Sequence, residues 1–401
     1  MKCVVLAAGE GKRVRPLTYT RPKVMLPIAN KPLLEWNLLN AIRAGINDFV
    51  FIIGYKGEKI RDYFGDGSKW NVKIRYLNQG KPIGTAHAVS LLKGQVGEFI
   101  VMCGDTIFGH EDIKKIAEHE NSMGVVNVEN PEQYGVVEIQ GDKVVKIREK
   151  EKFAQSNLIN AGIYHFDKDI FGFIEKTGIS PRGEYELTDS INLMIKEKKI
   201  KWIKLKEWRD VVYPWHLLDI NAEMLKSVEK KIDGDVEKGA FIKGEVIVGK
   251  GTKILSGSYI EGPVVIGENS KIGPNCYIRP FTSIGNNCRV GNACEVKNSI
   301  VMDGSKIPHQ NYVGDSIISS DCNLGAGTKI ANLRLDKKEI SVTLNGEKIK
   351  TERRKLGAII GDNVQTGINA MINPGTIIGN NVFIGPGAIA DGEIKPNARI
   401  M

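Results

Sequence analysis

The sequence predicts an α/β protein with a Rossmann-like, mostly parallel sheet domain over residues 1–213 and a left-handed parallel β-helix over residues 236–401. A connecting helix and linker are expected between them, over residues 214–235. The chain has 401 residues, which is more than one ordinary domain core accommodates. Its first half alternates short apolar runs with helical patterns, whereas its second half repeats with a period of six.

In the first half, apolar runs have the length and composition of buried strands. They cover residues 3–7, 49–53 and 99–102, and helical patterns separate them at residues 33–44 and 86–92. Such alternation indicates a mostly parallel sheet covered by helices on both faces. Because ligands of these folds bind at the carboxyl ends of the strands, we expect the chemistry of this domain there.

A helical pattern with Leu217, Leu218, Ile220 and Leu225 follows within residues 214–232, and Asp233-Gly234-Asp235 interrupts it. Beyond it, every sixth position is apolar, which is the signature of a hexapeptide-repeat β-helix with three hexads per triangular coil. The eleven positions in strict register are Ile242, Val248, Ile254, Ile260, Ile266, Ile272, Ile278, Ile284, Val290, Val296 and Met302.

Small residues recur four positions after the aliphatic ones and suit tight corners. They are Ser270, Cys276, Thr282, Cys288 and Cys294. Because the six cysteines show no C-x-x-C spacing, we expect packed thiols rather than a zinc site or a redox pair.

The hexad register breaks twice, near residues 308–312 and over residues 333–356, and resumes at Ile360. Asn345-Gly346 in the second break predicts a hairpin. Since a solenoid extrudes loops where its coils cannot supply a function, both breaks are candidate site positions. The second break carries the cations Lys337, Lys338, Lys348, Lys350, Arg353 and Arg354.

Composition narrows the classes of function. The net charge of +9 suits anionic ligands, but the basic residues are scattered and form no nucleic-acid-binding signature. No apolar run approaches the roughly 20 residues of a membrane helix, and Gly9 comes too early for a signal peptide's apolar region. We therefore expect a cytoplasmic protein whose anionic ligands are small phosphorylated molecules, and we expect it to bind neither nucleic acid nor membranes.

A glycine-rich turn follows the first strand, in the string Leu6-Ala7-Ala8-Gly9-Glu10-Gly11-Lys12-Arg13. Backbone N–H groups in such a turn can approach a phosphate chain, and Arg13 and Lys23 would add positive charge where a triphosphate reacts. The turn is not a Walker loop, because no Gly-Lys-Ser/Thr follows it.

The longer pattern resembles the sugar-1-phosphate nucleotidylyltransferases, in which L-A-A-G-x-G-x-R is followed by P-K. The resemblance continues in order through Gln79, Gly84-Thr85-Ala86, Gly104-Asp105, Tyr134-Gly135-Val136, Glu149-Lys150, Asn160-Ala161-Gly162 and Trp208-Arg209-Asp210.

The resemblance implies attack by a sugar 1-phosphate on the α-phosphorus of UTP or dTTP, with release of pyrophosphate. It implies that Asp105 and Asp210 hold Mg²⁺, that Arg13 and Lys23 are catalytic and meet the phosphates, and that Lys150 meets the sugar phosphate. Gln79 would bind the imide edge of the base, which uracil and thymine share. The other implied nucleotide- and sugar-binding residues are Leu6, Ala8, Gly9, Gly11, Gly84, Thr85, Gly135, Glu149 and Asn160.

The first break of the hexads contains His309, and its surroundings resemble the bifunctional bacterial N-acetylglucosamine-1-phosphate uridylyltransferase/glucosamine-1-phosphate acetyltransferases, which join the same two domains in this order. His309 would be the general base that keeps the attacking amine neutral. A backbone N–H near Ala326, within Gly-Ala-Gly-Thr, could stabilise the oxyanion of the thioester. The other implied residues for amino sugar phosphate and acetyl-CoA are Arg279, Lys297, Tyr312, Asn323, Asn332 and Lys338.

The resemblance thus implies a bifunctional, Mg²⁺-dependent enzyme of UDP-N-acetylglucosamine or related nucleotide-sugar synthesis that uses acetyl-CoA and forms a homotrimer. An alternative keeps only the nucleotidylyltransferase and makes the β-helix an assembly or regulatory module. The residues leave open UTP against dTTP and glucosamine against galactosamine 1-phosphate. The cations of residues 333–356 could meet the phosphates of coenzyme A or belong to a solvated hairpin.

Overall fold

The computed structural model describes residues 1–150 and 156–401, which form two compact units. The first unit comprises Met1–Glu10, Arg21–Met25 and Leu33–Asp210. The second comprises Gly11–Thr20, Leu26–Pro32 and Val211–Met401, so it includes two short segments from the N-terminal part of the chain.

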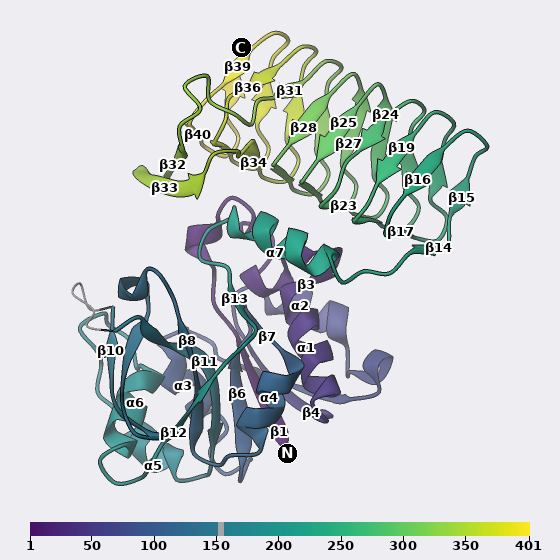
Figure 1. Ribbon diagram of the computed structural model, residues 1–401. Coiled ribbons are helices and arrows are strands. Elements are labelled where there is room, and N and C mark those ends of the chain that lie inside the picture. Colours follow the sequence, from purple (N-terminus) through teal and green to yellow (C-terminus); the bar gives the residue numbers. More distant parts are fainter. Residues whose placement is uncertain (151–155) are drawn as a thin grey trace. The chain divides into compact units, whose positions relative to one another are not determined.

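The first unit is built on one nine-stranded sheet with the order β5-β4-β1-β6-β11-β8-β12-β10-β9 (Figure 1). Its first four strands are parallel, and β11 then runs antiparallel to both of its neighbours, β6 and β8. The predicted Rossmann-like sheet is confirmed, and the expected strands and helices appear within a few residues of their predicted bounds. The strands are β1 Lys2–Ala7, β4 Asp48–Ile53, β5 Lys73–Asn78, β6 Phe99–Cys103, β8 Ser122–Asn127, β9 Gly135–Gln140, β10 Lys143–Glu149, β11 Leu158–Phe166 and β12 Lys201–Lys204.

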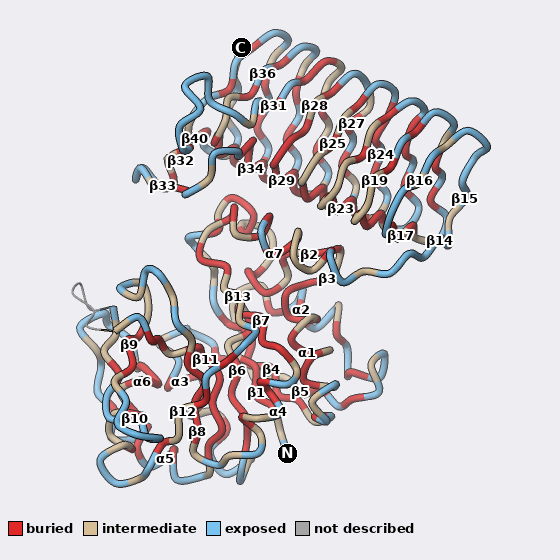
Figure 2. The backbone as a smooth tube through the Cα atoms, viewed as in Figure 1, coloured by how far each residue is buried: buried red, intermediate tan, exposed pale blue. Residues whose placement is uncertain are grey.

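Helices cover both faces of this sheet because its central strands are apolar on both sides. Along β1, Val4 packs into a cluster with residues of α3, α5 and α6, whereas Cys3 and Val5 pack into a second cluster with residues of α1, α2 and α4. Figure 2 shows these strands as a buried layer. The helices are α1 Leu33–Arg43, α2 Gly57–Phe64, α3 Thr85–Ser90, α4 His110–Ala117, α5 Ile170–Glu175 and α6 Leu187–Met194.

Short elements complete the N-terminal part of the chain. The strand β13 (Trp208–Asp210) pairs antiparallel with β7 (Thr106–Phe108) in the first unit, and β2 (Pro27–Ile28) pairs with β3 (Lys31–Pro32) in the second. The 3-10 helices are η1 Lys12–Val14, η2 Lys23–Met25, η3 Ser68–Trp70 and η4 Pro131–Gln133.

The main body of the second unit is a left-handed parallel β-helix, as the hexads predicted (Figure 1). Residues 18 positions apart lie in register on successive coils, for example Ile254 with Ile272 and Ile260 with Ile278. These side chains are fully buried and fill the interior, and the corner thiols of Cys276, Cys288 and Cys294 are buried with them.

Each coil except the last contributes one strand to each of three parallel sheets. The first contains β14 Lys231–Ile232, β17 Val246–Val248, β20 Val264–Ile266, β23 Thr282–Ile284, β26 Ile300–Val301, β29 Ile317–Ile318, β34 Ala358–Ile360, β37 Thr376–Ile378 and β40 Glu393–Ile394. The second contains β15 Asp235–Val236, β18 Lys253–Ile254, β21 Lys271–Ile272, β24 Arg289–Asn292, β27 Lys306–His309, β30 Asn323–Leu324, β35 Gln365–Thr366, β38 Phe383–Ile384 and β41 Arg399–Ile400. The third contains β16 Phe241–Lys243, β19 Tyr259–Glu261, β22 Tyr277–Ile278, β25 Glu295–Lys297, β28 Tyr312–Gly314, β31 Lys329–Ile330, β36 Met371–Ile372 and β39 Ile389–Ala390.

The connecting helix α7 (His216–Leu225) is shorter than the helical pattern over residues 214–232 predicted. Its expected end is wrong because Lys231 and Ile232 pair with Ile247 and Val248 as the first strand of the β-helix. Asn221 of α7 is fully buried and donates to the Phe281 carbonyl (3.1 Å). Among the described residues, no helix is long and apolar enough to cross a membrane.

The second break of the hexads forms an antiparallel hairpin of β32 (Ile340–Leu344) and β33 (Glu347–Arg353). Asn345 and Gly346 form its two-residue turn with φ values of 54° and 81°, which confirms the hairpin predicted from this dipeptide.

Candidate active sites

In the first unit, Lys23 lies between Asp105 and Asp210, the two aspartates that the family resemblance assigns to Mg²⁺. Its Nζ donates to Asp105 Oδ2 at 2.7 Å and lies 3.6 Å from Asp210 Oδ1. Asp105 follows β6 after one glycine, and Asp210 is the last residue of β13, which pairs with Thr106. The β7–β13 pairing therefore brings together two carboxylates that are 105 positions apart in the chain.

Gly104, which precedes Asp105, lies close to the backbone of β1. Its N–H donates to the Leu6 carbonyl (2.9 Å), and a Cβ at this position would lie 2.8 Å from the same oxygen. The preceding residue, Cys103, has a thiol pKa raised far above its ordinary value, chiefly by burial and further by the negative charges of Asp105, Asp210 and Glu149. Glu149 therefore lies within electrostatic reach of Cys103, as the two aspartates do.

The predicted sugar-binding residues gather where β9, β10 and β11 meet. Glu149 and Gly135 are direct partners in the β10–β9 register, and a Cβ at Gly135 would lie 2.9 Å from Glu149 Oε1. Asn160 on β11 donates to the Tyr164 hydroxyl (2.6 Å) and accepts from the Gly162 N–H (3.1 Å), which fixes its amide. Lys150 is exposed, with a positive φ of 51° and its N–H on the Tyr134 carbonyl.

Arg182 is a residue of this region that sequence reasoning missed. Its Nη2 lies 3.4 Å from Glu149 Oε2, and its Nε donates to Glu186 Oε1 (2.7 Å). Burial nevertheless raises the pKa of Glu149, and the positive charge of Arg182 offsets this only in part. No sequence motif marks Arg182, because it lies in an irregular segment before α6.

Gln79, which is predicted to bind the base, lies near Gly84 and Thr85 at the start of α3. Gln79 is buried, and its Nε2 donates to the Gly84 carbonyl (2.9 Å) and lies 3.4 Å from His87 Nδ1. Gly84 has a φ of 124° and approaches the backbone of Tyr185 so closely that a Cβ would lie 2.2 Å from the Tyr185 carbonyl oxygen. Thr85 Oγ1 accepts from the Leu187 N–H (2.9 Å).

The glycine-rich turn is divided between the units. Leu6 and Ala8 belong to the first unit, as does Gly9, where a Cβ would meet open space. Gly11 and Arg13 belong to the second. Gly11 has a left-handed conformation (φ 68°) and begins the 3-10 helix that carries the exposed Arg13, and its carbonyl accepts from Thr18 Oγ1 (2.9 Å).

In the second unit, the buried carboxylate of Asp315 connects several predicted acetyl-transfer residues. Its Oδ2 accepts from Lys297 Nζ (3.1 Å) and from Asn332 Nδ2, and its Oδ1 accepts from Asn298 Nδ2 (2.7 Å). Asn332 Nδ2 also lies 3.3 Å from the Tyr312 hydroxyl. Lys297 and Gly314 are register partners on adjacent coils, so the stacking of β25 on β28 holds this cluster together.

His309 ends β27 and is exposed. Its carbonyl accepts from the Gly327 N–H (2.9 Å), which places the turn containing Ala326 on the next coil directly at the His309 corner. Asn323 of β30 pairs in register with Lys306 of β27, the strand that ends at His309. Among the described residues, no hydrogen bond or ion pair joins His309 or Lys338 to Asp315, so the structure brings together only part of the predicted set.

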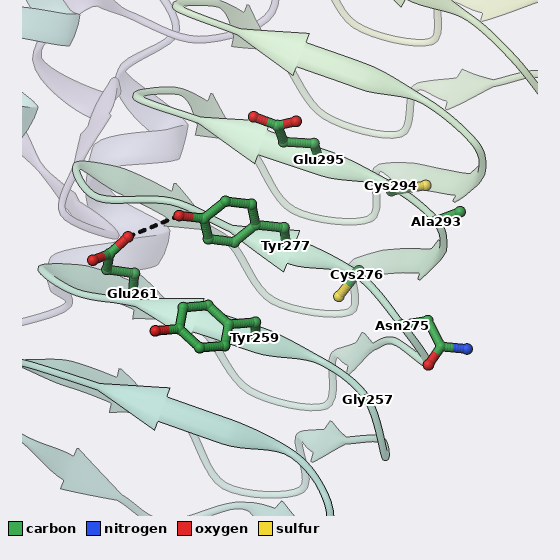
Figure 3. Close-up of a pocket in the computed structure, with 9 residues that line it drawn as sticks. All are labelled: Gly257, Tyr259, Glu261, Asn275, Cys276, Tyr277, Ala293, Cys294 and Glu295. Carbon is green, nitrogen blue, oxygen red and sulfur yellow. Dashed lines mark hydrogen bonds between the residues drawn. The ribbon is translucent and has the colours of Figure 1, made fainter.

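Arg279 pairs with Glu295 on the next coil, with 2.8 Å between Nη1 and Oε1. The outer face of the sheet here is hollowed by an open cavity of about 730 Å³ that Glu295 lines (Figure 3). Tyr259 and Tyr277 stand side by side on this face, and the Tyr277 hydroxyl donates to Glu261 (2.8 Å).

Comparison with known proteins places both halves of the chain. The nucleotidyl transferase family matches residues 2–227, the GMPPB C-terminal domain matches residues 260–366, and the bacterial transferase hexapeptide family matches residues 357–389.

Full-length relatives combine the two halves. The bifunctional protein GlmU of Methanocaldococcus jannaschii is 45% identical over 100% of this chain and 97% of its own. The bifunctional sugar-1-phosphate nucleotidylyltransferase/acetyltransferase of Sulfurisphaera tokodaii is 44% identical over 98% of each chain. Among solved structures, a UDP-glucose pyrophosphorylase complexed with UDP-glucose superposes with a TM-score of 0.51 at 25% identity, over 56% of this chain and 98% of that one.

Proposed function

Because the chain belongs to the family of bifunctional nucleotidyltransferase/acetyltransferase enzymes that includes GlmU, we propose that it acetylates an amino-sugar 1-phosphate with acetyl-CoA and transfers UMP or dTMP from UTP or dTTP to the sugar 1-phosphate. The proposed acceptors are glucosamine or galactosamine 1-phosphate. The proposed product is a UDP- or dTDP-activated N-acetylamino sugar, with pyrophosphate released.

The position of Lys23 between Asp105 and Asp210 supports the nucleotidyl transfer. The ammonium supplies positive charge next to two carboxylates, which are the hard oxygen ligands that Mg²⁺ prefers. Both aspartates would hold the metal, which would neutralise charge on the phosphates as the sugar phosphate oxygen forms a bond to the α-phosphorus and the bond to pyrophosphate breaks. Lys23 and Arg13 would stabilise the negative charge of the phosphates.

Residues around this pair would hold the other reactants. Glu149 and Asn160 would bind sugar hydroxyls beside the Gly135 backbone, and Lys150 would meet the sugar phosphate. Gln79, fixed by its hydrogen bond to Gly84, would read the imide edge of the base. The backbone of the glycine-rich turn would follow the triphosphate.

The Asp315 cluster supports acetyl transfer. It holds Lys297 and Asn332, and with them Tyr312, in fixed positions on adjacent coils. In the proposed reaction the amine nitrogen attacks the thioester carbonyl, the carbon–sulfur bond breaks, and the thiolate of coenzyme A leaves, to be protonated to the free thiol. His309 would accept the proton from the amine, and the Ala326 N–H would face the oxyanion.

The outer face of the third sheet supports a homotrimer. Phe241, Tyr259 and Tyr277 form a column of register partners on successive coils, and Phe241 is 64% exposed. An exposed aromatic column of this kind favours a protein partner, here a second copy of the same chain.

Two assays on the purified chain test the proposal. Pyrophosphate release from UTP and from dTTP with N-acetylglucosamine 1-phosphate measures nucleotidyl transfer. Release of free thiol from acetyl-CoA with glucosamine or galactosamine 1-phosphate measures acetyl transfer. Pyrophosphate release without any thiol release would instead favour the alternative, in which the β-helix is an assembly or regulatory module.

A further inference from the structure

The hairpin β32–β33 is a fixed part of the β-helix domain. Ile340, Val342 and Leu344 alternate along β32 and are buried, and a Cβ at Gly375 would lie 2.6 Å from Ile340 Cγ2. At its tip, the N–H groups of the Asn345-Gly346 turn donate to the two oxygens of Glu393, at 3.1 and 3.0 Å. The hairpin is therefore packed along β32 and hydrogen-bonded at its tip, so its backbone has a defined position on the β-helix.

The base of the hairpin adjoins the Asp315 cluster. The Leu356 N–H donates to the Asn332 carbonyl (3.0 Å), the Gly357 N–H donates to the Asp315 carbonyl (2.8 Å), and Leu333 pairs with Lys355. An open cavity of about 640 Å³ lies at this point. The charged residues that line it are Lys337, Arg353, Arg354, Lys355, Asp219 and Asp315.

The charges of this cavity do not balance. Asp219 pairs with Arg353, and Asp315 is already bound by Lys297 and two asparagines. Three exposed cations remain, Lys337, Arg354 and Lys355, and no ion pair within residues 1–150 and 156–401 engages them. Three unpaired cations in a cavity create a positive potential that favours a small, highly charged anion.

We propose that Lys337, Arg354 and Lys355, at the base of the hairpin, bind a phosphate monoester of an acetyl-transfer substrate. The source is either the 1-phosphate of the amino sugar or the 3′-phosphate of coenzyme A, which present the same dianion. Lysine and arginine suit this ligand because each N–H forms a charge-assisted hydrogen bond with phosphate oxygens. The position beside Asn332 and Asp315 would anchor the substrate next to the residues proposed for acetyl transfer.

The test compares two double variants of the full-length chain. R354Q/K355Q removes two charges from the cavity, and K348Q/K350Q removes two charges from exposed positions of the same hairpin outside it. Thiol release gives the KM for glucosamine 1-phosphate and for acetyl-CoA in each protein. Loss of charged hydrogen bonds should raise one of these KM values about tenfold or more in R354Q/K355Q, with kcat little changed, and leave K348Q/K350Q near wild type.

Substrates that lack one phosphate identify the source. If the sugar phosphate occupies the cavity, R354Q/K355Q and wild type should converge with glucosamine as acceptor. If coenzyme A occupies it, they should converge with acetyl-dephospho-CoA. A defect that persists with both phosphate-free substrates, or equal KM values in both double variants, would overturn the proposal.

The proposal rests on the proposed acetyl transfer, so binding is also measured without turnover. Calorimetric titration with glucosamine 1-phosphate and with coenzyme A should show weaker binding of one of them to R354Q/K355Q than to K348Q/K350Q. That result in a protein that acetylates neither amino sugar would refute the activity and retain the phosphate site. Equal binding of both probes by the two variants would refute the site.

Discussion

The ammonium of Lys297 lies 3.1 Å from Oδ2 of Asp315, and the side chain of Asp315 is only 4% exposed. The pair joins two coils of the β-helix, because Lys297 ends β25 and Asp315 directly follows β28. A buried carboxylate needs such partners, and in return it fixes the side chains that donate to it. Asp315 is therefore expected to act as a positioning residue for Lys297 and Asn332.

We expect Asp315→Asn to lower acetyl transfer by about 10–100-fold, since charge-assisted hydrogen bonds to Lys297 and Asn332 are lost. Nucleotidyl transfer should be unchanged. Asp391→Asn, at an exposed aspartate of the same domain, is the control. Both rates are measured on proteins whose melting has been checked, and wild-type acetylation in Asp315→Asn would remove its positioning role.

Chelation of divalent metal should abolish pyrophosphate release and leave thiol release intact. The physical reason is that, among the described residues of the two sites, the converging pair of carboxylates suited to a hard cation is Asp105 and Asp210 in the first site. Asp105→Ala should reproduce the effect of the chelator, and excess Mg²⁺ should restore the chelated wild type but not the variant. Undiminished pyrophosphate release by Asp105→Ala would exclude this residue from the metal site.

The ionised carboxylate of Glu149 should lower the stability of the folded protein while it serves nucleotidyl transfer. Burial raises the pKa of its carboxyl above the ordinary 4.5, so its ionised form is less favourable in the folded than in the unfolded protein. The destabilisation is absent below pH 4.5, develops as the pH rises from there through the raised pKa, and persists at neutral pH. Glu149→Gln removes it, so the urea midpoint of this variant should exceed that of wild type at pH 7.

At pH 4 the two midpoints should approach each other, because Glu149 is then largely protonated in both states. Nucleotidyl transfer by Glu149→Gln should fall at the same time, through a higher KM for the sugar 1-phosphate. A variant that is less stable than wild type at pH 7 would show that the ion pair with Arg182 outweighs the cost of burial.

Light scattering at working concentration should give a trimer, close to three times the 44.3 kDa of the chain. Replacing Tyr259 by Glu in the exposed aromatic column should dissociate it, because a charge would be buried without a partner. Lys250→Glu, at a corner of the same β-helix, serves as the control. An acetylating wild-type monomer would refute the trimer.

Much of the fold could be predicted because the sequence repeats with the geometry of the structure. The hexads specify the β-helix, since an interior side chain recurs every six residues and lies above its equivalent 18 residues earlier. Lys297 and Asp315 are themselves 18 residues apart, so the 18-residue period of one coil could also have predicted their pairing.

Other contacts have no sequence pattern that predicts them. Arg353 pairs with Asp219 across 134 positions, and Arg182 reaches Glu149 from a segment without a regular period. The predicted extent of α7 is also wrong, because pairing of Lys231 and Ile232 with β17 outweighs their local helical pattern. These features depend on tertiary packing, which local patterns do not encode.

Single substitutions should separate the two activities. His309 lies at a corner of the β-helix, whereas Lys23 lies between Asp105 and Asp210 in the first unit. His309→Ala should lower acetyl transfer by roughly 10²–10⁴-fold, as the loss of a general base does, and leave nucleotidyl transfer from pre-acetylated sugar phosphate nearly intact. Lys23→Ala should do the reverse.

His110→Ala, at a half-buried histidine of the first unit, controls for the loss of an imidazole. Because the His309 side chain is exposed, its removal should leave the melting temperature close to that of wild type, so a lost rate cannot be attributed to unfolding. Both rates and the melting curve are therefore measured on each variant. A His309→Ala protein that acetylates at the wild-type rate would refute the assignment of the base while leaving the β-helix unaffected, and a loss of both activities would point to a structural role instead.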